Sequence, residues 1–503
     1  MKIKRVLCLI LTLVMLLALS GTGYAEGSAG EKHLDLGISF CYSSIDAHKD
    51  YYGWMTSCYG VTEALFRIGD DLSLLPCVAE SYASDGSVWT IKLRDNACFS
   101  NGEAVTPEMC IRNLQRVAEV NERFAYMAGY QYAVLDEHSF SIDTGELYPT
   151  LVNDLASPEF AILDLDNTTD FDNAIIATGP FVIDKFIPEG DVSVVRNENY
   201  YGGEVKLDSV KFFYMPEDEP KLFAMQNGEI QGYDSVTAGA YEVYKLNPEL
   251  YQLTEAPGTR LQFYFLNKAS LSDNLRAAIN GIVDKENIAA YMKGTTTAAV
   301  GPFSANAAYG QVSVPKLTAD EARALIEADG YTLGADGVYE KDGQRLVINI
   351  CYYAGRSLDT IATILQAQLK EIGIDSKLTL EEDPDATYIA TRDFDLALYC
   401  MIADKSGDPY YFIDSTLRQG AYYDITGFHS DECEELINEL AKETEPARRA
   451  ELANRIIQMS IDDNVMGYLG LFNKITVLQP GITGFADTNP FDFYIVFADT
   501  DID

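Results

Sequence analysis

The stretch that decides the fold runs from Leu74 to Pro107 and reads LLPCVAESYASDGSVWTIKLRDNACFSNGEAVTP. Asp85-Gly86 predicts a turn between two β-prone runs, and residues 89–93 alternate in polarity as a half-buried strand does. Asn101-Gly102 predicts a second tight turn. Thr106-Pro107 then predicts a helix start, because proline is tolerated at a first-turn position that needs no amide donor. The sequence therefore predicts a β-hairpin region followed directly by a helix.

Four further segments follow in order along the chain. They are residues 177–181 (ATGPF), 196–203 (RNENYYGG), 275–286 (LRAAINGIVDKE) and 365–374 (LQAQLKEIGI). Together with residues 74–107, the series resembles the blocks of the extracellular solute-binding proteins of peptide-type ABC importers, a family that includes dipeptide, oligopeptide and nickel-complex receptors. One departure is Ala177, which stands where the family has glycine.

The resemblance spans about residues 34 to 485 and implies an α/β fold. The expected architecture is bilobal and periplasmic-binding-protein-like, of the large peptide-binding type, with an extra subdomain and a hinge between the lobes. The expected division assigns residues 26–47, 175–260 and 478–503 to lobe I, 48–174 to its extra subdomain, and 261–477 to lobe II. A chain that crosses the hinge more than once allows closure with little loss of packing inside either lobe.

The first 25 residues predict a secretory signal peptide. Lys2, Lys4 and Arg5 precede an apolar core at residues 6–19, and small residues stand near the expected cleavage site at Ala25. Cys8 lies at the start of the apolar run, so no lipobox is found. We expect export across the cytoplasmic membrane and a mature periplasmic or cell-surface chain from about Glu26, with an uncleaved anchor as the alternative.

Length and charge limit the class of protein. A chain of 503 residues exceeds the size at which single cores usually divide, so two or three lobes are expected. The formal charge of −40 argues against nucleic acid and anionic membrane as partners, and it favours cationic or zwitterionic ligands. Solubility outside the cell is an alternative explanation for the same charge.

Eight cysteines fall in the predicted mature chain, and none has a metal-binding spacing. An even number in an exported protein permits disulfides, but several occupy positions of apolar residues on predicted strands or helices. Bridges and buried free thiols both remain open at this point.

Two charged residues are the main candidates for holding a ligand. Asp404 follows the predicted buried strand 394–399, where the resemblance implies an Asp that pairs with a peptide's α-ammonium group, since an unpaired buried charge is costly. Asp408 is a rival in the same loop, and a turn-forming role for Asp404 is the alternative. Arg356, in the loop after strand 346–351, could hold a carboxylate bidentately. Dipeptide receptors place that arginine a few residues later, so a solvated loop arginine is the other interpretation.

Aromatic residues crowd the same neighbourhood, and tyrosine supplies a rigid apolar wall with a polar tip. Because the chain has 32 tyrosines, many must simply fill the core. The resemblance adds the loop after the first strand to the ligand side. The expected ligand-contacting set is Tyr42, Ser43, Tyr353, Arg356, Met401, Asp404, Tyr410, Tyr411 and Tyr423. No catalytic residue, metal site or cofactor is expected.

Enzyme motifs are missing from the sequence: no G-x-S-x-G elbow, H-E-x-x-H helix, phosphate-binding loop or dinucleotide fingerprint occurs. We expect a monomeric receptor that captures small peptides by clamshell closure and delivers them to an ABC permease in the cytoplasmic membrane. The alternatives are a receptor for a nickel or other metal chelate, a receptor for a sugar, and a surface sensor or adhesin without a transport role.

Overall fold

The computed structural model describes residues 31–353 and 355–503. The predicted signal peptide lies outside the described residues. Within the described part of the chain, no helix has the length and apolar character needed to cross a membrane.

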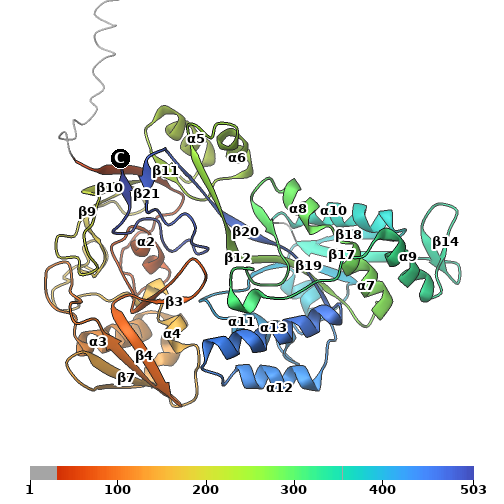
Figure 1. Cartoon of the computed structure of the whole chain (residues 1–503), viewed down its shortest axis with the longest axis horizontal. Coiled ribbons are helices and arrows are strands. Elements are labelled where there is room, and N and C mark those ends of the chain that lie inside the picture. Colours follow the sequence, from red (N-terminus) through yellow and green to blue (C-terminus); the bar gives the residue numbers. More distant parts are fainter. Residues whose placement is uncertain (1–30, 354) are drawn as a thin grey trace, which may run out of the picture.

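One long sheet connects two bodies of the molecule, which lie side by side in Figure 1. Its strand order is β18-β17-β19-β12-β20-β11-β1-β10-β9-β8, and β13 pairs with β20. The strands are β1 (His33–Ile38), β8 (Phe181–Phe186), β9 (Val192–Arg196), β10 (Ser209–Tyr214), β11 (Gly232–Tyr233), β12 (Gln252–Leu266), β13 (Thr296–Ala298), β17 (Val347–Tyr353), β18 (Asp375–Glu381), β19 (Leu396–Ile402) and β20 (Met466–Leu478).

The long strands β12 and β20 join the two bodies. One end of each strand pairs inside lobe I, where β20 meets β11, and the other end lies in lobe II, where β12 meets β19. Their mutual pairing is antiparallel and is interrupted between Pro257 and Leu261 and again between Gln262 and Phe263. Such irregularities bend a strand locally. The ribbon of β12 and β20 therefore forms the hinge that was predicted.

Lobe I is built on β1, which pairs in parallel with β10 and β11. Apolar side chains that alternate along β1, including Leu34 and Leu36, enter its core. Helix α2 packs Met55 and Cys58 into the same core. The other elements of this lobe are α2 (Tyr52–Cys58), α5 (Asp218–Asn227), α6 (Ala238–Lys245), β21 (Ile482–Thr483) and β22 (Asp501–Ile502).

The predicted hairpin and helix of residues 74–107 are confirmed, and they form the extra subdomain. Strands β4 and β5 pair around Asp85-Gly86, and the Thr106 side chain caps helix α3 by accepting from the Met109 amide. The region contains β2 (Phe66–Ile68), β3 (Leu74–Pro76), β4 (Ala79–Asp85), β5 (Val88–Leu93), α3 (Pro107–Val120), β6 (Gln131–Val134), β7 (Ser139–Asp143) and α4 (Leu151–Asp154).

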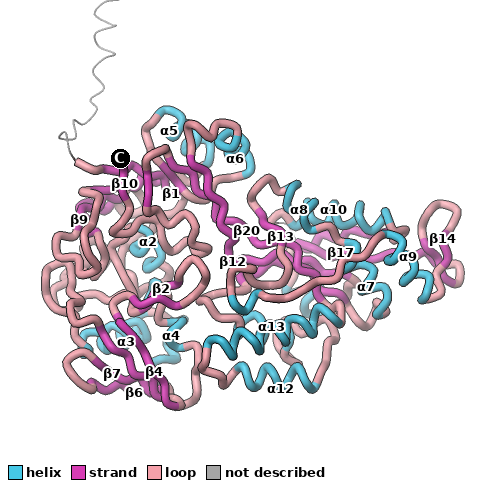
Figure 2. Tube along the Cα trace, in the orientation of Figure 1, coloured by secondary structure: helices cyan, strands magenta, loops and turns pink. Residues whose placement is uncertain are grey.

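Lobe II covers both faces of its part of the sheet with helices (Figure 2). Even-numbered residues of β19 pack with α7, α9 and α10, and odd-numbered ones pack with α11, α12 and α13. The elements are α7 (Asp273–Ile282), α8 (Lys285–Tyr291), α9 (Ala319–Ala328), β14 (Thr332–Leu333), β15 (Tyr339–Lys341), β16 (Gln344–Arg345), α10 (Leu358–Glu371), α11 (Tyr410–Leu417), α12 (Asp431–Leu440) and α13 (Pro446–Asp462).

The expected lobe boundaries at 260/261 and 477/478 fall inside β12 and β20, because these strands belong to both lobes. Residues 52–58 were expected in the extra subdomain, whereas α2 packs in the core of lobe I. The domain division therefore stays a proposal. All eight cysteines of the described chain are free thiols, six of them buried.

The buried Lys474 of β20 attaches the C-terminal segment to the hinge. Its ammonium group donates hydrogen bonds to the carbonyl oxygens of Ala486 (2.8 Å), Phe491 (3.2 Å) and Tyr494 (2.9 Å). All three donors of the group are thereby used. Lys474 thus fixes the segment that carries residues 486–494 against the ribbon.

We expect Lys474→Met to lower the free energy of unfolding by about 2–4 kcal/mol, because it leaves buried carbonyl groups without a donor. Urea unfolding followed by circular dichroism measures the loss. The matched control is Lys370→Met, at an exposed position of α10, which should change stability by less than about 0.5 kcal/mol. An equal loss of unfolding free energy in the two variants would show that the hydrogen bonds of Lys474 do not stabilise the fold.

Candidate functional site

Two arginines lie beside the hinge ribbon on the lobe II side. Arg260 lies on β12 and is half-buried, directly opposite Ile402 of β19. Gln262, two residues further on the same face of the strand, donates a hydrogen bond of 2.8 Å to the carbonyl oxygen of Arg356. This bond holds the backbone of Arg356, whose φ of 51° is left-handed, beside the hinge strand.

The charges of Arg260 and Arg356 lower the pKa of the same two neighbours, Cys400 and Tyr353. Burial raises the pKa of the Cys400 thiol to about 11, and the charges of Arg260 and Arg356 oppose that rise. Burial likewise raises the pKa of Tyr353 to about 12 against the same two charges. Arg260, Arg356, Tyr353 and Cys400 therefore lie close together on the lobe II side.

Lobe I contributes Trp54 and Asp492 from across the hinge. The indole Nε1 of Trp54 donates a hydrogen bond of 2.6 Å to the carbonyl oxygen of Asp492, and the exposed ring of Phe40 packs 5.5 Å from the Trp54 ring. The Asp492 carboxylate is open to solvent but enclosed by protein on most sides, and this desolvation with the nearby Asp234 raises its pKa. Lys474 and Arg260 act in the opposite direction. We name these six residues the hinge site: Trp54, Arg260, Tyr353, Arg356, Cys400 and Asp492.

The arginines of the hinge site form no ion pair among the described residues. Several other partly or fully buried arginines of this strongly acidic chain are paired with carboxylates, as in Arg449 with Asp408 and Arg116 with Asp46. The Arg260 side chain hydrogen-bonds the Cys400 thiol, and its charge acts on Asp492 without a direct contact. Two guanidinium groups outside ion pairs present donors to a ligand carboxylate.

A family model for the bacterial extracellular solute-binding proteins, family 5, matches residues 73–424. The match covers well over half of the chain. The chain belongs to this family.

Known members of family 5 resemble the chain along most of their length. The nickel-binding protein NikA of Staphylococcus aureus is 24% identical over 99% of this chain and 98% of its own length. The crystal structure of a nickel ABC transporter protein from Bacillus halodurans superposes with a TM-score of 0.87 at 26% identity, over 94% of this chain and 100% of that one. The oligopeptide-binding protein AppA of Bacillus subtilis is 21% identical over 92% of this chain and 89% of its length.

Family membership fixes the general role. The chain is an extracytoplasmic substrate-binding component of an ABC importer, which binds a small solute and works with a permease. The fold predicted from the sequence is confirmed by the match to the family and its solved structures.

The predicted ligand-contacting residues fall into separate groups in this family 5 fold. Tyr353 and Arg356 belong to the hinge site, and Tyr423 packs near Tyr353 because both contact the ring of Tyr399. Met401 is buried in β19. Tyr353 and Met401 lie at the C-terminal ends of β17 and β19, and the contact of this group with a ligand stays a prediction.

Tyr42 and Ser43 lie in lobe I, in the loop after β1. The Tyr42 ring packs against Tyr52 with centroids 5.1 Å apart, whereas Ser43 is exposed. In lobe II, Tyr410 and Tyr411 begin helix α11; Tyr410 is half-buried, and Tyr411 lies under the ammonium group of Lys405 at 3.5 Å from the ring centroid. Their contact with a ligand stays a prediction.

Asp404 and Asp408 are both engaged inside lobe II. Asp404 is buried and accepts hydrogen bonds from the Tyr309 hydroxyl and from the Gly407 amide. Asp408 accepts two bonds from Arg449, at 2.7 and 2.8 Å. The structure thus gives both carboxylates protein partners, and a ligand role for Asp404 stays a prediction.

The loop that carries these carboxylates forms a contact between the lobes. The Asn153 side-chain amide of the extra subdomain donates to the Ser406 carbonyl oxygen at 3.0 Å. Gly407 has φ 72°, and a Cβ there would come within 2.5 Å of the Leu72 carbonyl oxygen. Only glycine fits this approach, so the loop serves in interlobe packing. A cavity of about 410 Å³ lies beside it, between Tyr148 and Tyr410.

Sequence reasoning missed Trp54, Arg260 and Asp492. A signal existed for two of them: Trp54 is one of only two tryptophans, and Arg260 is a single charge at the start of the apolar run 261–266. Asp492 had none, since the chain holds 77 acidic residues. Within the described ranges, no three His, Cys, Asp or Glu side chains are grouped so as to bind a metal ion.

The Asp404 carboxyl generates a pH-dependent prediction. Burial raises its pKa to about 7 from an unfolded value near 3.9, so the folded state keeps a proton that the unfolded chain loses. Wild-type stability should therefore fall between about pH 4 and pH 7 relative to Asp404→Asn. The difference in unfolding free energy between the two proteins should change by on the order of 1 kcal/mol or more over this pH range.

Urea unfolding of both proteins at pH 4.5 and pH 8 measures this effect. Other groups that face the loop, among them Asp154, Lys405 and Asp408, are common to both proteins and largely cancel in the difference. Parallel stability curves across that range would show that Asp404 is ionised in the folded protein throughout.

Proposed function

We propose that this protein is the receptor for a nickel ion carried by a small chelator with carboxylate groups. The observation that carries the proposal is the pair of guanidinium groups of Arg260 and Arg356 at the hinge site, neither of which forms an ion pair among the described residues. The S. aureus relative and the B. halodurans structure, both named for nickel, support the same choice of cargo. The chelator would supply most ligands of the metal, and the protein would recognise its carboxylates.

The hinge site has suitable chemistry for such an anionic complex. Each guanidinium can bind one carboxylate through two parallel hydrogen bonds. Trp54 and Tyr353 add flat apolar walls with polar edges, which fit the carbon skeleton of a chelator. Because Arg260 lies on the strand shared by the lobes and Arg356 belongs to lobe II, the complex would be held at the hinge itself.

A short peptide is the second candidate. The exposed Asp492 lies near Arg260, so the hinge site also offers opposite charges to an α-ammonium and an α-carboxylate group. AppA, which is named for oligopeptides, shares the family. In this version Asp492 takes the role that the sequence predicted for Asp404.

Closure would follow from population shift. A ligand that touches both Trp54 and Arg356 favours the closed form by its differential affinity for that form. The ribbon of β12 and β20 would bend, and the packing between the extra subdomain and lobe II would change with it. We propose that the exported chain acts as a monomer and releases its cargo chemically unaltered to the permease.

Isothermal titration calorimetry and thermal shift with defined probes test the choice of cargo. The probes are the nickel complex of L-histidine, free nickel chloride, and L-alanyl-L-alanine. We expect the nickel complex to stabilise the protein, by about 2.7 kcal/mol at 100 times its Kd. A response to the dipeptide alone would transfer the assignment to peptides, and a response to neither would reject the hinge site as a carboxylate site.

Variants of the hinge site give a sharper test. Arg260→Met and Arg356→Met should each weaken the nickel complex at least about tenfold, which corresponds to 1.4 kcal/mol. The matched control is Arg392→Met, at an exposed arginine of lobe II that forms no ion pair among the described residues. The proposal is wrong if calorimetry gives the same affinity for all three variants and the wild type.

A further inference from the structure

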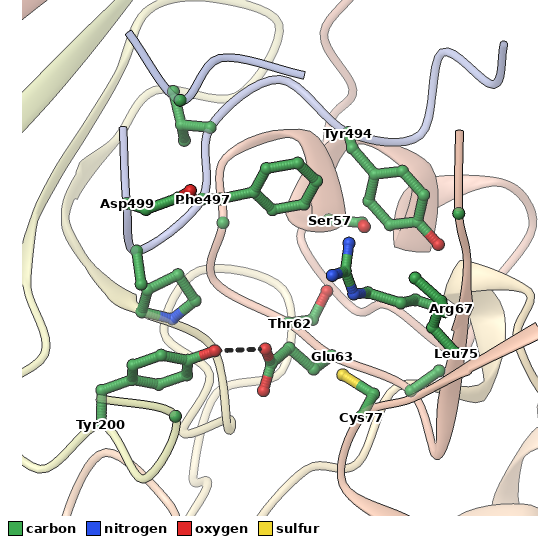
Figure 3. Close-up of a pocket in the computed structure, with 18 of the residues that line it drawn as sticks. Ser57, Thr62, Glu63, Arg67, Leu75, Cys77, Tyr200, Tyr494, Phe497 and Asp499 are labelled. Carbon is green, nitrogen blue, oxygen red and sulfur yellow. Dashed lines mark hydrogen bonds between the residues drawn. The ribbon is translucent and has the colours of Figure 1, made fainter. Parts of the chain in front are cut away.

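A second, larger cavity lies within the lobe I half of the molecule, away from the hinge site. Its volume is about 650 Å³, and it opens at the seam between the β2–β3 hairpin, the loop 200–204 and the C-terminal segment 484–499 (Figure 3). None of the six hinge-site residues lines it. We name this cavity the seam pocket. Its volume falls within the range of small-molecule sites, about 300–1,000 Å³.

Arg67 points into the seam pocket without an anionic partner. Its guanidinium carbon lies 5.2 Å from the centroid of the Phe497 ring, and no ion pair or side-chain hydrogen bond of Arg67 occurs among the described residues. The side chain is half-buried and lines the pocket. A partly desolvated guanidinium with all five donors free is an unusual feature in a folded protein.

The carboxylate of Glu63, which also lines the pocket, is already hydrogen-bonded. Its two oxygens accept hydrogen bonds from the hydroxyl groups of Tyr200 (2.8 Å) and Tyr201 (2.6 Å). Burial raises the pKa of Glu63, although these two bonds and, more weakly, the charge of Arg67 oppose the rise. Figure 3 shows the bond from Tyr200 and the separate position of the Arg67 guanidinium. The tyrosines therefore orient Glu63 and leave Arg67 available.

Two acidic side chains on the pocket lining are also free. Glu204 and Asp499 form no ion pair or side-chain hydrogen bond within the described residues, and both are exposed. By contrast, Asp70 accepts from Thr488 and Asn489. In Figure 3, Asp499 and Arg67 lie on opposite sides of the Phe497 ring. The pocket thus presents one cation and separate anions across an aromatic wall.

We propose that the seam pocket binds a small zwitterion of the α-amino-acid type. Arg67 holds the carboxylate bidentately, and Asp499 with Glu204 attracts the ammonium group. The rings of Phe497 and Tyr494 cover the side chain. The several carboxylates of the lining disfavour a purely anionic ligand, and Arg67 disfavours a purely cationic one, so opposite charges in one molecule satisfy the pocket best.

Three related compounds test the proposal on the mature chain: L-leucine, L-leucinamide, which lacks the carboxylate, and 4-methylpentanoate, which lacks the ammonium group. Ligand-observed NMR with titration up to about 10 mM covers the range of weak small-molecule affinities. We expect L-leucine to bind and each analogue to bind at least tenfold more weakly. Equal binding of leucinamide would overturn the zwitterion assignment, and so would the absence of leucine binding.

Variants then locate the site. Arg67→Met should weaken leucine at least tenfold, and Asp499→Asn, at an exposed position that tolerates substitution, should weaken it several-fold. Arg392→Met is the matched control. The double variant Arg260→Met/Arg356→Met should leave leucine binding unchanged. If the double variant lost leucine binding while Arg67→Met kept it, leucine would bind in the hinge site and the proposal would be overturned. This conclusion does not depend on whether the nickel complex binds.

Discussion

The antiparallel pairing of β12 with β20 is the interaction on which the rest of the structure depends. These strands are the only ones in the described sheet that pair within both lobes. Their hydrogen bonds make the hinge a two-stranded ribbon, and its irregularities near Pro257 and Gln262 allow it to bend without breaking the ladder elsewhere. Lobe I and lobe II each have a core cluster of their own, and a further cluster joins the extra subdomain to the helices α11, α12 and α13 of lobe II.

The ribbon also brings the functional charges together. Arg260 is fixed by β12, Arg356 is fixed by Gln262 of the same strand, and Asp492 is fixed by Lys474 of β20 through the carbonyl groups around it. The same strands therefore support the hinge and position the ligand-binding groups. A ligand that binds there acts directly on the element that bends, so binding and closure are linked by geometry.

Charge is distributed unevenly in this acidic chain. Most buried arginines are used in fixed pairs, such as Arg449 with Asp408 and Arg276 with Asp463. Among the described residues, the half-buried Arg260 of the hinge site and Arg67 of the seam pocket form no ion pair. A buried pair holds structure, whereas a free cation in a concave surface is available to a ligand. Whether an arginine forms an ion pair therefore distinguishes the structural arginines of this protein from those available to a ligand.

The sequence by itself determined the local structure and the family. Turn chemistry at Asp85-Gly86 and the cap at Thr106 depend on neighbouring residues alone, so the hairpin and helix could be predicted, and the order of such segments identified the fold. Only the tertiary structure decided the site. Asp404 was predicted from its loop, but its hydroxyl donor is Tyr309, 95 positions away, and Arg356 is held beside the strand of Arg260 by a bond from Gln262 that spans 94 positions. Free and paired charges look identical in sequence, because pairing is decided by distant segments that only folding brings together.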